Sequence, residues 1–243
     1  MSEPYYRPDL ALVHHRGFGF HADLCAPGIV DRLAPVRERD GLVLEFGCGS
    51  GLLTRYLVEA GFRVLATDAS PAMLELARTT APGAEAIERL TLPVDPVPDA
   101  DAVVGIGHPL NYLPSAHDVD AALVALARAL RPGGIFATDL CDFEWAATRV
   151  DQPDSARVGD DWAIISRFSV PAPDRFVRDM TTFLLNPDGS WRRDDEHHDN
   201  VMVDVAGVPA LLEAEGVDAE VRRGFGTEEL PVGLSAVVGE RPA

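Results

Sequence analysis

Three glycines at alternating positions, set between an apolar run and a helical stretch, mark a site suited to a nucleotide-like ligand. Gly47, Gly49 and Gly51 follow the apolar run 42–46, and 52–60 has the composition of a helix. Glycine accepts positive φ and carries no Cβ, so a ligand can lie against the backbone where the first helical amides point outward. The pattern predicts a strand, a glycine loop and a helix that together bind a cofactor.

Two carboxylates beside this loop narrow the choice of cofactor. The spacing is G-x-G-x-G, and Leu52 stands where dinucleotide-binding folds place a third glycine. Glu45, at the end of the strand, would repel a pyrophosphate and would tolerate a cationic ligand better. Asp68 ends the next apolar run, 63–67, and is placed to accept hydrogen bonds from both hydroxyls of a ribose.

The motifs E-F-G-C-G-S-G (45–51) and T-D-A-S (67–70) resemble the class I S-adenosylmethionine (SAM)-dependent methyltransferases. The resemblance is specific over roughly residues 42–140 and looser over the rest. It implies an α/β, Rossmann-like fold with a seven-stranded, mostly parallel sheet and helices on both faces. It also implies SAM as the cofactor and S-adenosylhomocysteine (SAH) as the product.

The resemblance assigns the methionine part of SAM to the glycine loop and the ribose to Asp68. The adenine position is less distinct, because the usual aspartate is absent and Glu88 and Arg89 are the best matches. The predicted cofactor-binding residues are Glu45, Gly47, Cys48, Gly49, Ser50, Gly51, Asp68, Ala69, Met73, Glu88, Arg89 and His108.

Histidine is the side chain best suited to take a proton from an acceptor near neutral pH. His108 and Tyr112 follow the expected fourth strand, 101–107, and so lie over the carboxyl ends of the central strands, where ligands bind in open α/β sheets. We therefore predict His108 as the first candidate base. Helix capping or packing is the alternative for His108, and a core position is the alternative for Tyr112.

Two further pairs of histidines are adjacent in the sequence, so only one member of each can face a pocket. His14 and His15 lie in an expected helix, where neighbours are about 100° apart. His197 and His198 lie in an expected strand, where neighbours point to opposite faces, and we select His198 as the inward one. The run D-D-E-H-H-D (194–199) would suit a metal, but a solvated charged strand explains it equally well, so we predict no metal.

The composition excludes several classes of function. A net charge of −18 and a pI near 4.6 repel phosphate backbones and anionic membranes, so we expect neither nucleic acid nor a membrane as a partner. All 21 basic residues are arginines, which excludes Schiff-base and P-loop lysine chemistry. Three scattered cysteines and the absence of a long apolar run favour a cytoplasmic protein.

The order of predicted elements describes one domain, 1–243, in four segments. A helical cap (1–40) precedes a SAM-binding core (41–150), an antiparallel β insertion (151–203) lies over the mouth of the site, and 204–243 completes the core. Within the cap we expect helices near 9–15 and 29–33; within the insertion we expect strands at 162–170, 176–186 and 190–203. The final helix is expected at 204–215 and the last strands at 217–225 and 234–240.

These features predict methyl transfer to the N, O or C atom of a small, cationic or aromatic molecule, resembling bacterial natural-product methyltransferases. The alternative is a protein of the same fold that binds SAM without methylating, as a regulator, cyclase or decarboxylase. A nicotinamide oxidoreductase is disfavoured by Leu52 and Glu45. The sequence is compatible with a monomer or a homodimer.

Overall fold

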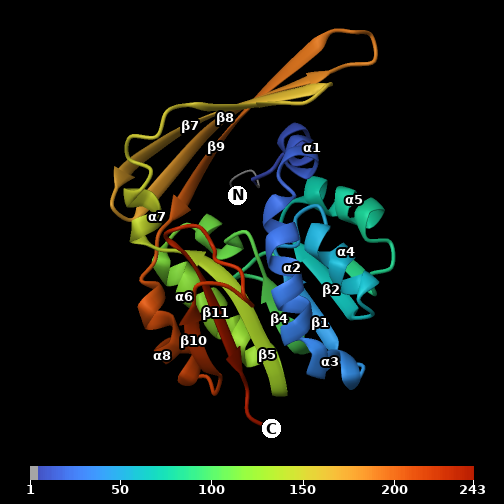
Figure 1. Ribbon diagram of the computed structural model, residues 1–243, viewed down its shortest axis with the longest axis vertical. Helices are drawn as coiled ribbons and strands as arrows, with labels where there is room; N and C mark the ends of the chain where they lie inside the picture. The colour runs from blue at the N-terminus through green and yellow to red at the C-terminus, as the bar shows by residue number, and fades with distance from the viewer. Residues whose placement is uncertain (1–4) are drawn as a thin grey trace.

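A seven-stranded sheet forms the centre of the core in this computed structural model, which describes residues 5–243 (Figure 1). The strand order is β10-β11-β5-β4-β1-β2-β3, and β11 alone runs in the opposite direction to the other six strands. This arrangement confirms the predicted Rossmann-like fold. The strands are β1 (Leu42–Phe46), β2 (Arg63–Asp68), β3 (Ala86–Arg89), β4 (Ala100–Gly105), β5 (Leu130–Cys141), β10 (Asp218–Arg222) and β11 (Leu234–Glu240).

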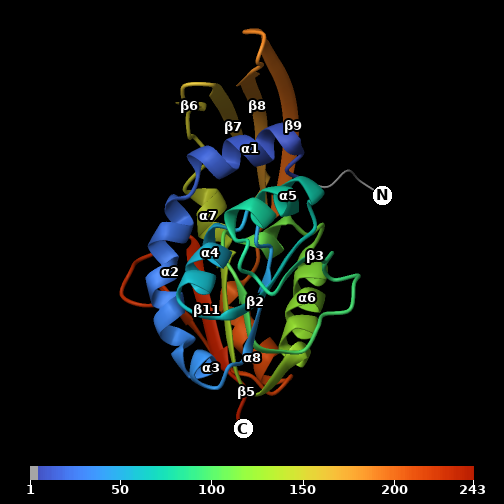
Figure 2. The same cartoon turned by 90° about the vertical axis from the view of Figure 1, so that its right-hand side faces the viewer.

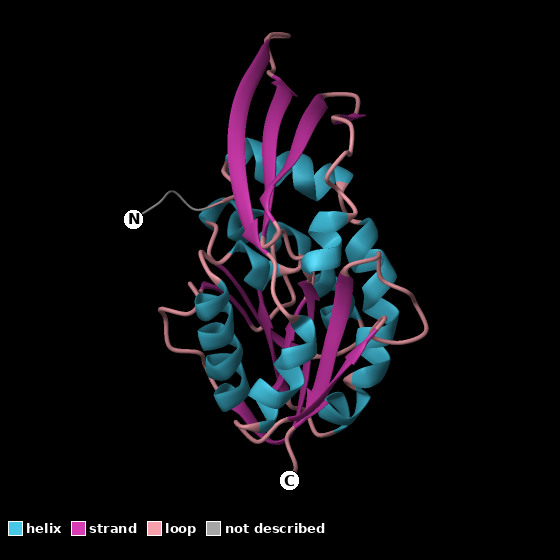
Figure 3. Ribbon diagram, turned by 90° about the vertical axis from the view of Figure 1, so that its left-hand side faces the viewer, coloured by secondary structure: helices cyan, strands magenta, loops and turns pink. Residues whose placement is uncertain are grey.

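Helices cover both faces of this sheet (Figure 3). One face packs against α2 (Phe20–Arg32), α3 (Ala34–Glu38), α4 (Leu52–Glu59) and α5 (Pro71–Thr80). The other face packs against α6 (Ala116–Ala129) and α8 (Val208–Glu213). No helix in residues 5–243 is both long and apolar enough to cross a membrane.

The central strands are mostly apolar because both of their faces are buried. Adjacent residues of β1 belong to different clusters: Val43 packs with Leu57 of α4, and Leu44 packs with Leu126 of α6. A strand covered on both sides has no polar face to alternate with. This burial explains why the apolar run 42–46 was correctly predicted to be a strand from the sequence alone.

A second, antiparallel sheet stands above the carboxyl ends of the core strands, and we call it the lid (Figure 2). Its order is β6-β7-β8-β9, with β6 (Ser155–Val158), β7 (Trp162–Ala172), β8 (Arg175–Leu185) and β9 (Trp191–Val201). The three predicted strands are present, and β6 adds a fourth that was not predicted, before the first of them. The short pairing of β6 with β7 supplies that strand, and all four β6 residues are exposed.

Helix α1 (Pro8–Gly17) joins the lid to the core, because it contacts β7, β8 and β9 as well as α5. Leu10 and Val13 of α1 pack with Ile164 and Met180 of the lid in a small separate core. The cap and the lid are therefore one packed unit, although about 150 residues separate them in the chain.

Two predicted helix boundaries are wrong. Helix α2 begins at Phe20 and continues through Pro27, whereas the sequence predicted only 29–33, after the proline and glycine. Burial of Cys25 and Ile29 against the sheet stabilises the longer helix and offsets the hydrogen bond that the proline removes. The stretch 204–215 divides into the short 3₁₀ helix η2 (Val205–Gly207) and α8.

Substitution of a glycine in the central sheet tests how tightly these layers pack. A Cβ at Gly105 would lie 2.5 Å from the ring of Phe46, which is itself buried. Gly105→Ala should therefore lower the free energy of unfolding by about 1–3 kcal/mol in urea titrations. Gly19→Ala is the control, because its nearest contact would be an ordinary 3.6 Å. Equal stability of the two variants would contradict the packing described here.

Candidate active site

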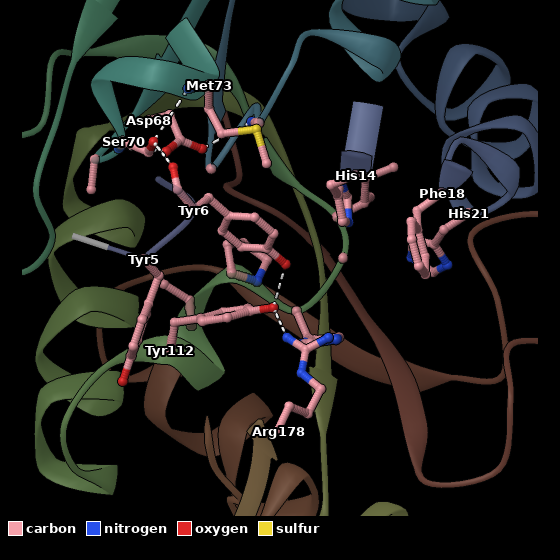
Figure 4. Close-up of a pocket in the computed structure, with 18 of the residues that line it drawn as sticks. Tyr5, Tyr6, His14, Phe18, His21, Asp68, Ser70, Met73, Tyr112 and Arg178 are labelled. Atoms are coloured by element: carbon pink, nitrogen blue, oxygen red, sulfur yellow. Dashed lines mark hydrogen bonds between the residues drawn. The ribbon is translucent and has the colours of Figure 1, made fainter. Parts of the chain in front are cut away.

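A cavity of about 1710 Å³ lies between the carboxyl ends of the core strands and the lid. The glycine loop and Asp68 form one end of its lining, and aromatic and charged residues of α1, α2 and the lid form the other. Figure 4 shows side chains from both ends facing this space. The cavity is therefore enclosed by segments from the cap, the core and the insertion.

The three glycines of the loop all have positive φ, but the space around them differs. At Gly49 a Cβ would meet only the Met73 sulfur, at 3.9 Å, so this part of the backbone is open to the cavity. At Gly47 a Cβ would lie 2.4 Å from Pro109, and at Gly51 it would lie 3.0 Å from Ala77 of α5. The loop is therefore packed from behind and open in front, as a cofactor cradle requires.

Asp68 holds the loop in place. Its Oδ2 accepts a hydrogen bond from the Gly49 amide at 2.9 Å, and its Oδ1 accepts one from the Ser70 amide at 2.8 Å. Burial raises the pKa of Asp68, and these backbone hydrogen bonds oppose that rise. A carboxylate has about four acceptor positions, so two remain for ligand hydroxyls.

Glu45 lies beneath the loop and is only 2% exposed. Its Oε2 has no hydrogen-bond partner among the described residues, and burial raises its pKa to about 8. Glu45 lines the cavity, so a ligand donor or cation at this end could supply the missing partner. The open face at Gly49 and the unpartnered oxygen of Glu45 fit the methionine part of SAM.

Most of the predicted cofactor residues line the cavity, and two do not. Gly51 packs against α5, and Glu88 is exposed on the edge strand β3. The prediction of Glu88 as an adenine contact is therefore not supported, because its side chain lies outside the lining. The residues that line the cavity are Glu45, Gly47, Cys48, Gly49, Ser50, Asp68, Ala69, Met73, Arg89 and His108.

Of the adjacent histidines in α1, His14 lines the cavity and His15 does not. The ring of His14 stacks on that of Phe18, four residues further along, with the ring centroids 5.3 Å apart. The Nδ1 atom of His15 lies 3.0 Å from the hydroxyl of Ser50 in the glycine loop. Burial and the charge of Arg178 lower the pKa of His14 to about 3.

His108 and Tyr112 both line the cavity, with their rings stacked at 5.6 Å. His108 has a left-handed backbone, with φ of 49°, and begins the 3₁₀ helix η1 (Pro109–Tyr112). Its Nδ1 is buried with no hydrogen-bond partner in residues 5–243, and burial followed by the charge of Arg178 lowers its pKa to about 3. His108 is therefore neutral and a weak base.

The strand alternation predicted for β9 is confirmed, because His198 is buried and His197 points outward to Asp179. His198 lies behind the tyrosines rather than in the cavity lining, and its Nε2 is 2.9 Å from Glu196. No group of three or more His, Cys, Asp or Glu side chains in residues 5–243 is arranged to hold a metal ion.

The pair formed by His21 and Asp139 was not predicted from the sequence. His21, on α2, lines the cavity, and its Nε2 lies 2.6 Å from Asp139 Oδ2 near the end of β5. Asp139 is fully buried and also accepts the amides of Gly107, at 3.0 Å, and His108, at 2.6 Å. Burial alone would lower the pKa of His21, but the hydrogen bond and charge of Asp139 outweigh it and raise the pKa.

Arg178 of the lid was also not predicted as a site residue, because nothing in the sequence around it distinguishes it from the other arginines. Its guanidinium donates a hydrogen bond to the Tyr112 hydroxyl, which lies 2.7 Å from the Tyr6 hydroxyl. Asp139 could have been suspected from its place, since it interrupts the apolar run F-A-T-D-L-C of β5.

Comparisons with known proteins agree with the predicted resemblance. Residues 43–134 match the family described as "Methyltransferase domain". The putative methyltransferase YqeM of Bacillus subtilis is 28% identical over 162 residues, which cover 65% of this chain and 66% of that protein. The chain spans 66% of the length of YqeM and 35% of the length of the malonyl-[acyl-carrier protein] O-methyltransferase of Serratia marcescens.

Solved structures share the fold over nearly the whole chain. The sugar N-methyltransferase KedS8 of Streptoalloteichus has a TM-score of 0.79 at 20% identity, covering 100% of this chain and 97% of that one. SAM-bound CalS10 of Micromonospora, an amino pentose methyltransferase involved in calicheamicin biosynthesis, has a TM-score of 0.70 at 22% identity, covering 99% of both chains. At these identities the likeness shows the fold alone.

The buried Glu45 should make stability depend on pH. Between pH 4.5 and about 8 the folded protein keeps the proton on Glu45, whereas the unfolded chain releases it. The free energy of unfolding therefore falls as pH rises through this window. Glu45→Gln removes that loss. The variant should gain on the order of a few kcal/mol over the wild type at pH 8.5, and little at pH 5, in urea titrations.

The exposed Glu75 on α5 provides the control for this pH dependence, because Glu75→Gln should leave stability unchanged at both pH values. A Glu45→Gln effect of the same size at pH 5 and pH 8.5 would mean that Glu45 is ionised throughout.

Proposed function

We propose that this chain, whose residues 43–134 match the methyltransferase-domain family, transfers a methyl group from SAM to a small-molecule acceptor. The observation that carries the proposal is a single cavity with two unlike ends. One end is the open glycine loop fixed by Asp68, and the other is an aromatic wall beneath the lid. A cofactor and a small acceptor can therefore meet inside the protein.

Bound SAM supplies a methyl group already activated by its sulfonium, so the protein's main task is to position the acceptor and exclude water. The loop and Asp68 would hold the methionine and ribose parts at one end, with the Met73 sulfur beside Gly49. The lid and α1 would cover the acceptor, since both line the cavity.

The size and surroundings of the cavity favour a small acceptor over a macromolecule. The net charge of −18 disfavours nucleic acid, and the cavity is covered by a packed sheet. The titles of KedS8 and CalS10 name a sugar and an amino pentose as what those proteins methylate. We therefore propose an amine or hydroxyl of a small polar molecule, in bacterial natural-product biosynthesis, as the acceptor.

We assign the general base to His21 rather than to His108. A base works best with a pKa near the working pH and with a third group that orients it. Asp139 orients His21 and raises its pKa, whereas His108 and His14 have pKa values lowered to about 3. His108, stacked on Tyr112, would contact the acceptor, and His21 would take the proton released by the attacking atom.

Cofactor binding tests the first part of this proposal. Calorimetric titration should give binding of SAM and SAH and none of NAD. Asp68→Ala should weaken SAH binding roughly 10- to 100-fold, because it removes charged hydrogen-bond acceptors from the loop and the ribose. The exposed Asp99→Ala is the control and should bind as the wild type does. NAD binding alone would contradict the proposal.

A panel of amines, amino sugars and phenols, assayed for SAH formation, then tests methyl transfer itself. Formation of SAH with any acceptor supports the proposal. SAH binding without turnover across the panel would favour a protein that binds the cofactor without methylating.

Histidine titration by NMR tests the base without needing the acceptor. The imidazole of His21 should titrate above 6.5 in the wild type, and below it in Asp139→Asn, where burial is no longer opposed by a carboxylate. Identical His21 titration in the two proteins would remove Asp139 from this role.

A further inference from the structure

One half-buried charge in the cavity has no counterion among the described residues. Arg178 of β8 lines the cavity, and in residues 5–243 no carboxylate lies within ion-pair distance of it. Its guanidinium donates to the neutral hydroxyl of Tyr112, and its Nε is buried with no partner in the described part of the chain. Figure 4 shows the guanidinium directed towards the tyrosines and the cavity.

Most arginines of the lid are paired with carboxylates; among the described residues Arg178 and the exposed Arg157 of β6 are not, and Arg157 instead donates to the Gly17 carbonyl. Arg175 lies 3.7 Å from Asp199, Arg192 pairs with Asp9 at 2.8 Å, and Arg167 pairs with Asp154 at 3.0 Å. A protein with 39 acidic residues could readily place one beside Arg178. Its position instead leaves an enclosed cation facing the space where the acceptor would lie.

An enclosed charge without a partner is costly, and the neighbouring groups do not neutralise it. Arginine stays protonated in proteins, and burial raises the pKa of Tyr112 so that its hydroxyl remains neutral. The positive charge also lowers the pKa of His14 and His108, which remain neutral beside it. A bound anion would supply the negative charge that the described residues do not.

The contacts of Tyr6 place Arg178 at the acceptor end of the cavity. The carbonyl of Tyr6 accepts from Ser70 Oγ at 2.8 Å, next to Asp68, and its hydroxyl reaches Tyr112 at 2.7 Å. The length of the Tyr6 side chain thus separates Arg178 from the cofactor loop. A group bound to Arg178 lies on the lid side of the cavity.

We propose that Arg178, Tyr112 and Tyr6 form an oxyanion subsite that binds a carboxylate or phosphate group of the methyl acceptor. This inference rests on the proposed function and deepens it, because it makes the substrate an anionic small molecule bearing an amine or hydroxyl. The planar guanidinium suits bidentate pairing with either oxyanion, and the tyrosine hydroxyls can donate further hydrogen bonds. A purely cationic acceptor, as the sequence suggested, would be repelled by Arg178.

Sodium acetate and sodium phosphate serve as probes, titrated at constant ionic strength against sodium chloride into protein saturated with SAH. One or both anions should bind the wild type by calorimetry at neutral pH, where both probes are ionised and the guanidinium of Arg178 is charged. Arg178→Met should weaken that binding at least tenfold. Arg178→Lys should retain part of it, and the paired lid residue Arg167→Met should bind as the wild type does.

The two probes distinguish the chemistry of the acceptor: binding of acetate alone assigns a carboxylate, and binding of phosphate alone assigns a phosphoryl group. Absence of an effect of either anion on wild-type protein that binds SAH would overturn the subsite. A tenfold loss of SAH affinity in Arg178→Met would also overturn it, because Arg178 would then hold the cofactor's own carboxylate. Failure of the wild type to bind SAH would instead overturn the proposed function, and the anions would then be titrated into the SAH-free protein.

Discussion

The buried carboxylate of Asp139 is the constraint on which the acceptor end of the cavity depends. A fully buried charge needs donors, and Asp139 obtains them from the His21 ring and from the amides of Gly107 and His108. These donors come from α2 and from the turn after β4, so one carboxylate fixes both relative to β5. The positions of His21 and His108 thus follow from satisfying a single buried charge.

A second set of contacts ties the lid to the cofactor loop through the start of the chain. The amide of Tyr6 donates to Glu196 of β9 at 2.9 Å, and its carbonyl accepts from Ser70, the N-cap of α5. Tyr6 has a positive φ of 60°, an uncommon conformation for a tyrosine, which these contacts on both sides stabilise. The segment before α1 is therefore part of the cavity wall and couples its two ends.

The electrostatics of the two ends are opposite in sign. Asp68, held by backbone amides, places a carboxylate at the loop, where a cationic sulfonium cofactor fits, and Arg178 places a cation under the lid. Burial keeps His14 and His108 neutral between them, so they add no charge. Glu45 keeps its proton at neutral pH and adds no charge. Such a cavity favours a cationic molecule at one end and an anionic one at the other.

The sequence by itself determined the features that depend on local physics. The glycine spacing, Glu45 and Asp68 defined the cofactor end, because a strand, a tight turn and a helix start are set by neighbouring residues. The same holds for the inward face of β9 at His198, which follows from the strand period.

Only the tertiary structure decided the acceptor end. His21 and Asp139 are 118 residues apart, and Arg178 differs from the paired lid arginines in having no carboxylate partner among the described residues. Which charges are neutralised, and which remain open to a ligand, depends on packing between distant segments and leaves no local pattern in the chain.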